Sequence, residues 1–200
     1  MLPERVAGVV LAAGLSSRMG LNKMLLELGG RTLVRRTVTT AFSAGLDPVL
    51  VVLGHESDRV RTELSGLPYR AVLNPDYARG MNTSLRAGIA ALPDDAAGAV
   101  VLLGDMPLVD ALMVRALLTA FRRSGPKLAI SSYGGVVAPP ILYGRALFPE
   151  LRALEAESCG KSVVRNYRPE AVELQWPPET LTDLDSPEDV ERIRARLEAA

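Results

Sequence analysis

Short apolar runs and segments of helical periodicity alternate along the first two thirds of the chain. The apolar runs begin at Val6 and recur at residues 49–53, 69–73, 99–103 and 128–131. Runs of this length and character are typical of strands that a sheet buries on both faces. Helical spacing of apolar residues is found at 31–44, 57–64 and 110–121, and from a start near residues 82–84. The pattern predicts parallel strands joined by amphipathic helices.

The last third of the chain is less regular. Residues 134–140 form a turn-rich crossing, and the predicted elements after it are helices at 145–154 and 162–167 and strands at 141–143, 171–174 and 181–184. Ser186 and Pro187 are typical of a helix start, with Val190, Ile193 and Leu197 as the buried stripe of that last helix. No linker or repeat interrupts the chain. We expect one α/β domain over residues 1–200, a Rossmann-like, mainly parallel sheet with helices on both faces.

The composition disfavours some classes of function. The 200 residues are 48% hydrophobic, enough to bury a sizeable core, and 23 basic residues balance 23 acidic ones. A net charge of zero disfavours bulk electrostatic binding to nucleic acid or to a membrane surface. A single cysteine, the lack of a signal-peptide pattern and the lack of a membrane-spanning apolar run lead us to expect a cytoplasmic protein.

The loop after the first strand carries the main chemical signal. Leu11, Ala12, Ala13 and Gly14 lead into Ser16, Arg18, Gly20 and Lys23. Small residues let backbone N–H groups approach an anion closely, and glycine tolerates a positive φ. Arg18 and Lys23 add positive charge, so the loop predicts a triphosphate cradle at the carboxyl end of a parallel strand. Neither the P-loop pattern nor the G-x-G-x-x-G fingerprint is present in it.

A second candidate lies where another buried strand ends. Gly104 and Asp105 follow the run at 99–103, and ligands of parallel sheets bind beyond the carboxyl ends of the strands. The cradle and Asp105 should therefore share one edge of the sheet. Magnesium is commonly held by one or two carboxylates together with phosphates, so Asp105 is a candidate Mg²⁺ ligand. The alternative is an aspartate that bonds only its own turn.

The motif L-A-A-G-x-S-x-R-M-G-x-x-K at Leu11–Lys23 resembles the signature of small nucleotidyltransferases of the molybdenum cofactor cytidylyltransferase type. Residues 74–88 resemble the family's N-P-[DE]-[WY]-x-x-G-[LM]-x-x-S-[LI]-x-x-G segment. Residues 183–189 resemble its D-x-D-[ST]-P-E-D segment. The resemblance implies nucleotide contacts from the cradle, Asn74, Gly80, Ser84 and Gly104. It implies Asp185 as a second Mg²⁺ contact and CTP, because two alanines follow Leu11. In the alternative interpretations, Ser84 and Asp185 only cap helices.

The implied reaction is transfer of CMP from Mg–CTP to a phosphate of the molybdenum–molybdopterin cofactor, with release of pyrophosphate. Arg18, Lys23 and Asp105 are the implied catalytic residues. Residues 1–132 would bind the nucleotide and residues 133–200 the acceptor, which a recipient molybdoenzyme could then take up. Lys161 is a candidate contact to the acceptor phosphate. The chain departs from the family at residues 155–161 and at Pro139-Pro140, both on the acceptor side.

Three other functions stay open. Transfer to a different phosphorylated acceptor, such as a sugar phosphate or an isoprenoid precursor, fits the departures on the acceptor side. A nucleotide-binding assembly factor would bind a triphosphate without turnover, although Lys23 and Asp105 favour an enzyme. A nicotinamide oxidoreductase is disfavoured by the missing fingerprint. His55 and Cys159 receive no catalytic role. A lone histidine after a strand is more often structural than catalytic, and Cys159 has no histidine near it in sequence to activate it.

Overall fold

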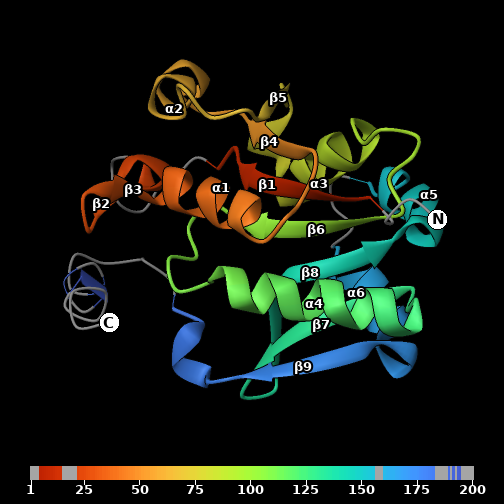
Figure 1. The fold of residues 1–200 in the computed structure, drawn as a ribbon. Coiled ribbons are helices and arrows are strands. Elements are labelled where there is room, and N and C mark those ends of the chain that lie inside the picture. Colours follow the sequence, from red (N-terminus) through yellow and green to blue (C-terminus); the bar gives the residue numbers. More distant parts are fainter. Residues whose placement is uncertain are drawn as a thin grey trace.

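The computed structural model describes residues 5–14, 22–155, 160–182, 189, 191, 193 and 194. In this part of the chain, seven strands form one sheet of order β5-β4-β1-β6-β8-β7-β9 (Figure 1). The strands are β1 (Val6–Ala12), β4 (Val49–Leu53), β5 (Arg70–Leu73), β6 (Gly98–Leu103), β7 (Leu128–Tyr133), β8 (Val136–Gly144) and β9 (Val172–Trp176). Only β8 runs antiparallel to its described neighbours in this sheet. The mainly parallel sheet is therefore confirmed.

Helices cover both faces of this sheet, as predicted. They are α1 (Leu33–Ser43), α2 (Ser57–Glu63), α3 (Met81–Ala90), α4 (Ala111–Ser124), α5 (Phe148–Arg152) and α6 (Lys161–Tyr167). Buried side chains of α1 and α4 form one core cluster with alternate residues of the central strands. Side chains of α3, α5 and α6 form the second cluster on the opposite face. None of the described helices is long and apolar enough to cross a membrane.

Side-chain caps begin the two longest helices of the described residues, α1 and α4. Thr32 Oγ1 accepts a hydrogen bond from the Arg35 N–H at 3.4 Å, and Asp110 Oδ1 accepts one from the Met113 N–H at 2.9 Å. These oxygens satisfy N–H groups that have no partner within the helix. The helical spacing at 110–121 corresponds to α4, and Met113 and Val114 are among the side chains that this helix buries.

The interpretation of residues 134–140 as a crossing is wrong. Gly134 and Gly135, both at positive φ, form a two-residue turn between β7 and β8, the connection that favours such glycines. The register shifts beside Pro139-Pro140, which cannot donate to the ladder. Ser131 Oγ donates to the Pro140 carbonyl at 2.8 Å, and the Tyr133 hydroxyl donates to the Pro139 carbonyl at 2.8 Å. Side chains thus supply the hydrogen bonds that the bulge removes from the ladder.

Other boundaries also differ from the sequence interpretation. The helical spacing expected from residue 31 begins two residues later, because Arg31–Thr32 form the strand β3. This strand pairs with β2 (Glu27–Leu28), which follows the 3₁₀ turn η1 (Lys23–Leu25). The stretch at 145–154 divides into η3 (Arg145–Leu147) and α5. The predicted strand at 181–184 is wrong for Leu181 and Thr182, which follow the 3₁₀ turn η5 (Pro178–Thr180), and its remainder lies outside the described residues.

The remaining 3₁₀ turns are η2 (Tyr77–Arg79) and η4 (Arg168–Glu170). Near the C-terminus, Ile193 is buried against Leu28 and Leu33, as the predicted apolar stripe requires. Val190 and Leu197, the other members of that stripe, and the proposed helix start at Ser186 lie outside the described residues.

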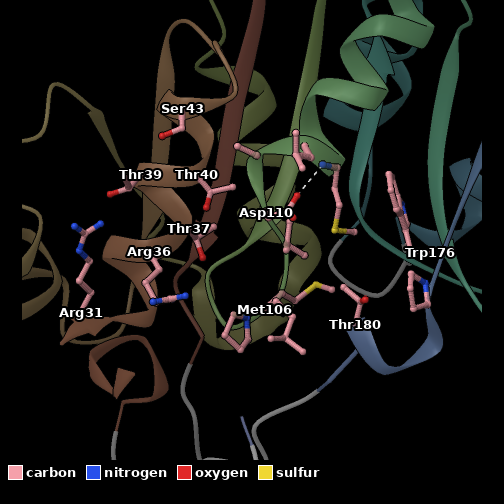
Figure 2. A pocket seen from close by; sticks show the side chains of 17 residues that line it. Arg31, Arg36, Thr37, Thr39, Thr40, Ser43, Met106, Asp110, Trp176 and Thr180 are labelled. Atoms are coloured by element: carbon pink, nitrogen blue, oxygen red, sulfur yellow. Dashed lines mark hydrogen bonds between the residues drawn. The ribbon is translucent and has the colours of Figure 1, made fainter. Parts of the chain in front are cut away.

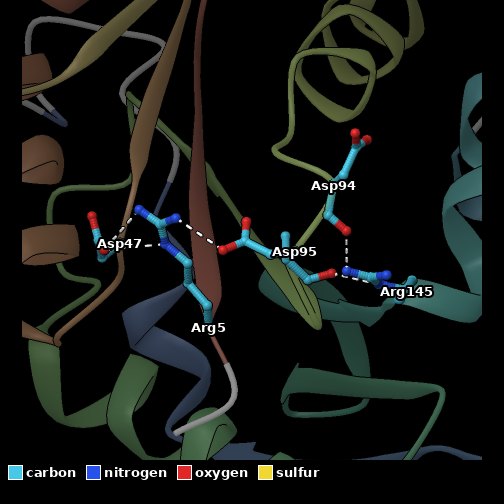
Figure 3. A network of polar contacts seen from close by, with 6 residues as sticks. Arg5, Asp47, Asp94, Asp95 and Arg145 are labelled. Carbon is cyan, nitrogen blue, oxygen red and sulfur yellow. Dashed lines mark hydrogen bonds and ion pairs between the residues drawn. The ribbon is translucent and has the colours of Figure 1, made fainter. Parts of the chain in front are cut away.

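Ion pairs and hydrogen bonds join the connections at the amino-terminal end of β1 (Figure 3). Arg5 pairs with Asp47 at 3.1 Å and with Asp95 at 3.1 Å, and the hydrogen bond to Asp95 is the main cause that raises the pKa of Arg5. Arg145 Nε donates to the carbonyl oxygen of Ala96 at 2.8 Å. These contacts fasten the connections before β4 and β6. They lie at the end of the sheet opposite the candidate site.

Candidate functional site

The carboxyl ends of four parallel strands meet at one edge of the sheet. Leu11 of β1 is paired with Leu103 of β6, and Ala12 is paired with Leu53 of β4. Leu53 is in turn paired with Leu73 of β5. The residues that follow these strands, among them Gly14, Asn74 and Asp105, are therefore brought to one edge, as the sequence predicted for the cradle and Asp105.

The described part of the cradle is a buried strand end that opens at Gly14. Leu11, Ala12 and Ala13 are buried, and Gly14 is exposed with open space around its α-carbon. The φ of Gly14 is not positive, so a left-handed backbone is not what requires glycine at this position. The Ala13 carbonyl accepts a hydrogen bond from the His55 N–H at 3.3 Å. Ser16, Arg18 and Gly20 lie outside the described residues.

Lys23 lies in η1, close to the strand ends. Its exposed fraction is only 9%, which is unusual for a lysine, and the preceding Asn22 caps the turn by accepting from the Met24 N–H at 3.0 Å. Met24 covers Gly104 so closely that a Cβ on this glycine would lie 2.6 Å from the Met24 Sδ. Because Asp105 follows Gly104 directly, this packing fixes the lysine turn relative to the predicted metal ligand.

Two backbone contacts hold Gly104 from its other sides. Its N–H donates to the Leu11 carbonyl at 3.0 Å, and its carbonyl accepts from the Thr37 hydroxyl at 3.4 Å. Thr37 is a buried residue of α1 that also bonds the Leu33 carbonyl. Sequence reasoning missed Thr37, because a threonine inside a helix gives no signal of a partner that is 67 residues away.

Asn74 is the centre of a buried polar network at the start of α3. Its Nδ2 donates to the hydroxyls of Thr83 and Ser84, both at 2.9 Å, and its Oδ1 accepts from the Asp76 N–H at 3.0 Å. The exposed fractions of Asn74 and Ser84 are 3% and 4%. The amide of Asn74 is therefore used in holding the segment together, whereas Gly80, at φ 117°, is exposed. Contacts of Asn74, Gly80 and Ser84 with a nucleotide base stay a prediction.

A group of residues after β4 lies beside the cradle and was not predicted as part of the site. A Cβ on Gly54 would lie 2.6 Å from Tyr77 and 2.9 Å from Ala13, so only glycine fits between them. The ring of His55 lies 6.2 Å from the ring of Tyr77. Glu56 adopts a left-handed backbone, and a hydrogen bond from Arg59 is the main cause that lowers the pKa of the Glu56 carboxyl.

The acceptor-side candidates are only partly described. Lys161 is exposed and is the first residue of α6, and the Gly160 N–H before it donates to the Asn82 Oδ1 at 2.9 Å. Asp185 and Cys159 lie outside the described residues. Within the described ranges, no group of three or more His, Cys, Asp or Glu side chains could hold a metal ion. The second metal contact therefore stays a prediction.

A cavity of about 700 Å³ lies between α1, the start of α4 and the end of β9 (Figure 2). Arg31 and Arg36 line it from the α1 side and Trp176 from the β9 side. Burial is the main cause that lowers the pKa of Arg36, and the charge of Arg31 lowers it further. None of the described candidate site residues lines this cavity, but Thr37, which bonds Gly104, and Met106, which follows Asp105, do. The cavity therefore borders the candidate site at the end of β6.

Residues 8–172, most of the chain, match the MobA-like NTP transferase domain family. The chain belongs to this family. It is 30% identical to the purine catabolism protein PucB of Bacillus subtilis, over 95% of this chain and 96% of PucB. It is 31% identical to the nicotine blue oxidoreductase of Paenarthrobacter nicotinovorans, over 84% of this chain and 85% of that protein. Membership in the family makes the protein a nucleotidyltransferase and leaves its acceptor open.

Solved structures agree with the fold. Rv0371c from Mycobacterium tuberculosis H37Rv superposes with a TM-score of 0.86 at 29% identity, covering 98% of this chain and 100% of that chain. A manganese complex of Rv0371c superposes with a TM-score of 0.80 at 28% identity, covering 96% and 98%. Some relatives are longer bifunctional proteins: the chain spans 26% of the GlmU of Clavibacter sepedonicus and 22% of the IPC transferase and DIPP synthase of Rubrobacter xylanophilus.

Proposed function

We propose that this nucleotidyltransferase transfers CMP from Mg–CTP to the phosphate of the molybdenum–molybdopterin cofactor and releases pyrophosphate. One observation carries the proposal. The strand ends bring the cradle residues Ala13 and Gly14, the buried Lys23 and the Gly104-Asp105 pair to one edge of the sheet. That edge thus collects small residues, a cation and a carboxylate, which are the groups that a metal-bound triphosphate needs.

The reaction needs no general base from the protein. An oxygen of the acceptor phosphate attacks the α-phosphorus of CTP, the bond from the α-phosphorus to the bridging oxygen breaks, and pyrophosphate leaves with that electron pair. A phosphate monoester is largely ionised near neutral pH, because its second pKa is about 6. Catalysis then consists of positioning and charge neutralisation. Lys23 would neutralise the charge that grows on the α-phosphate, and Arg18 with the cradle N–H groups would hold the β- and γ-phosphates.

Mg²⁺ fits the residues at this edge. Asp105 offers carboxylate oxygens, the ligand type that Mg²⁺ prefers, and such ions are usually completed by phosphates and water. Asp185 would be the second protein ligand. The bound cation would supply charge neutralisation at the phosphates. The manganese complex of Rv0371c supports a divalent cation in this family.

Two alanines in the cradle motivate the choice of CTP. The proposal follows the resemblance in which Leu-Ala-Ala-Gly goes with CTP and Leu-Ala-Gly-Gly with GTP. Ala13 is 3% exposed, and its Cβ lies 2.9 Å from the position where a Cβ on Gly54 would stand. The methyl group of Ala13 therefore fills the space beside Gly54 and Tyr77. An Ala13→Gly change would open this space on the side of the cradle nearest to residues 74–84.

A different phosphorylated acceptor is the second candidate. The relative from Rubrobacter xylanophilus, named an IPC transferase and DIPP synthase, is 42% identical over 97 residues, 46% of this chain. The chain also departs from the cytidylyltransferase pattern at Pro139-Pro140 and at 155–161. Both departures fall in the half that we assign to the acceptor, so a sugar phosphate or an isoprenoid phosphate is the alternative acceptor.

Pyrophosphate release tests the proposal. Purified protein with Mg²⁺ receives CTP, GTP, ATP or UTP, each with and without the molybdenum cofactor. We expect release from CTP only when the cofactor is present. Release with sugar phosphates or isoprenoid phosphates instead would select the alternative acceptor. CTP binding with no turnover would point to the non-catalytic assembly factor, and an absence of nucleotide binding would contradict the cradle.

Matched variants test the assigned roles. Lys23→Met and Asp105→Asn should each lower kcat by about a hundredfold or more, the usual effect of losing a group whose contact strengthens in the transition state. Lys127→Met and Asp94→Asn are controls of the same chemical type on exposed positions at the opposite end of the sheet. They should leave kcat unchanged. Near-normal turnover of the Lys23 or Asp105 variant would remove the role assigned to that residue.

A further inference from the structure

Helix α3 contacts both predicted halves of the site. Its first turn contains Thr83 and Ser84, which bond the buried Asn74 beside the predicted nucleotide segment. Asn82, which lies between Met81 and these residues, bonds in another direction: its Oδ1 accepts from the Gly160 N–H at 2.9 Å. Because Gly160 immediately precedes Lys161, this bond connects the nucleotide segment with the predicted acceptor residue across 78 positions of sequence.

Gly160 lies close against α3. A Cβ at this position would lie 2.9 Å from the Leu85 Cδ2, inside van der Waals contact. The missing side chain lets the backbone of residue 160 come within hydrogen-bonding distance of Asn82. Lys161 itself is exposed. Its position therefore depends on the backbone that Asn82 and Leu85 hold.

A second contact of α3, made by Arg86, can be compared with the contact between Asn82 and Gly160. Arg86, four residues after Asn82 and so one turn along the same face, donates through Nη1 to the Leu154 carbonyl at 3.3 Å. This contact also ties α3 to the segment before α6. It ends at residue 154, away from Lys161. Arg86 can thus serve as a matched control for loosening of α3 in general.

We propose that Asn82 is a positioning residue that sets Lys161 for the acceptor phosphate, so that its loss weakens acceptor use and leaves CTP binding intact. This inference rests on the proposed function. Removal of the Asn82 oxygen takes this acceptor away from the half-buried Gly160 N–H, and loss of a hydrogen bond destabilises the backbone conformation that forms it. Loss of Asn82 should therefore weaken binding of the acceptor phosphate and leave the affinity for CTP unchanged.

The variant Asn82→Leu removes the acceptor oxygen at similar side-chain volume, and Asn82→Asp keeps an oxygen for the Gly160 N–H. Three quantities are measured for each with Mg²⁺, CTP and the molybdenum cofactor: Kd for CTP, KM for the cofactor and kcat. Hydrogen exchange of the peptide that contains residues 160–167 reports on the bond without any turnover. The same quantities are measured for Lys161→Ala and for the double variant Asn82→Leu/Lys161→Ala.

For Asn82→Leu we expect faster exchange at Gly160, a KM for the cofactor raised about tenfold and a Kd for CTP within about twofold of wild type. Asn82→Asp should restore both exchange protection and acceptor KM. Asn82→Leu in the Lys161→Ala background should add little further effect, since both changes act on one contact. Arg86→Met should lower the melting temperature without raising the KM for the cofactor.

Several results would overturn the inference. Unchanged exchange at Gly160 in Asn82→Leu would mean that the bond does not order this backbone. Faster exchange with an unchanged KM for the cofactor would mean that the ordered backbone serves no acceptor contact. An equal rise of KM in Arg86→Met would assign the effect to α3 as a whole. A wild-type protein that releases no pyrophosphate with any acceptor would instead contradict the proposed function, a separate and recognisable failure.

Discussion

The packing of α3 on the sheet depends on a glycine that sequence periodicity does not explain. Gly88 lies inside this helix, and a Cβ there would stand 2.4 Å from the Val9 Cγ1 and 3.0 Å from the Val52 Cγ2. Both valines are completely buried. Carbon atoms in contact are about 3.5–4.0 Å apart, so the helix or Val9 would have to move by roughly 1 Å or more.

Two opposing contributions determine how Gly88→Ala changes the free energy of unfolding. Overpacking of a close-packed core costs about 1–3 kcal/mol, and a separation of 2.4 Å calls for the upper part of that range. Alanine is better than glycine inside a helix by about 1 kcal/mol. We therefore expect Gly88→Ala to lower the free energy of unfolding by about 2 kcal/mol, although alanine is the stronger helix former.

Urea unfolding followed by circular dichroism measures the effect, and a compensating change isolates its cause. Val9→Ala removes the Cγ1 atom that the new methyl group meets, while alone it leaves a cavity that destabilises the core. In the double variant the methyl group introduced at position 88 takes up that space. The double variant should lose about 1–2 kcal/mol less than the sum of the single losses. A neutral or stabilising Gly88→Ala, or strictly additive effects, would refute the overpacking argument.

Two further predictions concern polar groups. Asn74→Ala removes the donor of two buried hydrogen bonds, to Thr83 and Ser84, and should lower the free energy of unfolding by about 2–3 kcal/mol; an unchanged urea midpoint would contradict a structural role. Arg168 is the main cause that lowers the pKa of Glu173 below its ordinary value of 4.5. Glu173→Gln should therefore lower the melting temperature slightly at pH values above about 5, with the difference vanishing as the pH falls through the folded-state pKa; a difference that persists at about pH 2–3 would contradict this cause.

The parallel part of the sheet could be predicted because its central strands are apolar throughout their length. The strands around Val10, Val51 and Val101 have no polar position, and such runs occur where helices cover both faces. The same reasoning fails for β8. Two consecutive prolines, Pro139 and Pro140, disfavour a central strand, and only the side-chain hydrogen bonds from Ser131 and Tyr133 make the bulge acceptable. Ser131 and Tyr133 meet the two prolines only in the folded protein, so no pattern along the sequence predicts these hydrogen bonds.

The candidate site, like the sheet, could be predicted from the sequence only in part. The meeting of the cradle with Asp105 follows from topology alone, because the carboxyl ends of adjacent parallel strands share an edge. The groups that hold the site could not be found from the sequence. Thr37, which bonds the Gly104 carbonyl, and Asn82, which bonds the Gly160 N–H, are single polar residues on amphipathic helices. Their partners lie on other elements, so no spacing along the chain reveals them.

Four glycines around the site share one physical cause. Gly54, Gly88, Gly104 and Gly160 all have ordinary backbone angles, so a left-handed backbone is not what requires glycine there. At each of them a Cβ would meet another residue at less than 3.0 Å. They permit close approach of Tyr77 to β4, of α3 to the sheet, of the Lys23 turn to β6, and of the Lys161 backbone to α3. The close contacts at these four points lie beside the predicted nucleotide, metal and acceptor residues. A methyl group should disturb this packing most at Gly54 and Gly88, where it would meet Tyr77 and Ala13 or Val9, and less at Gly104 and Gly160, where the end of a flexible Met24 or Leu85 side chain can move aside.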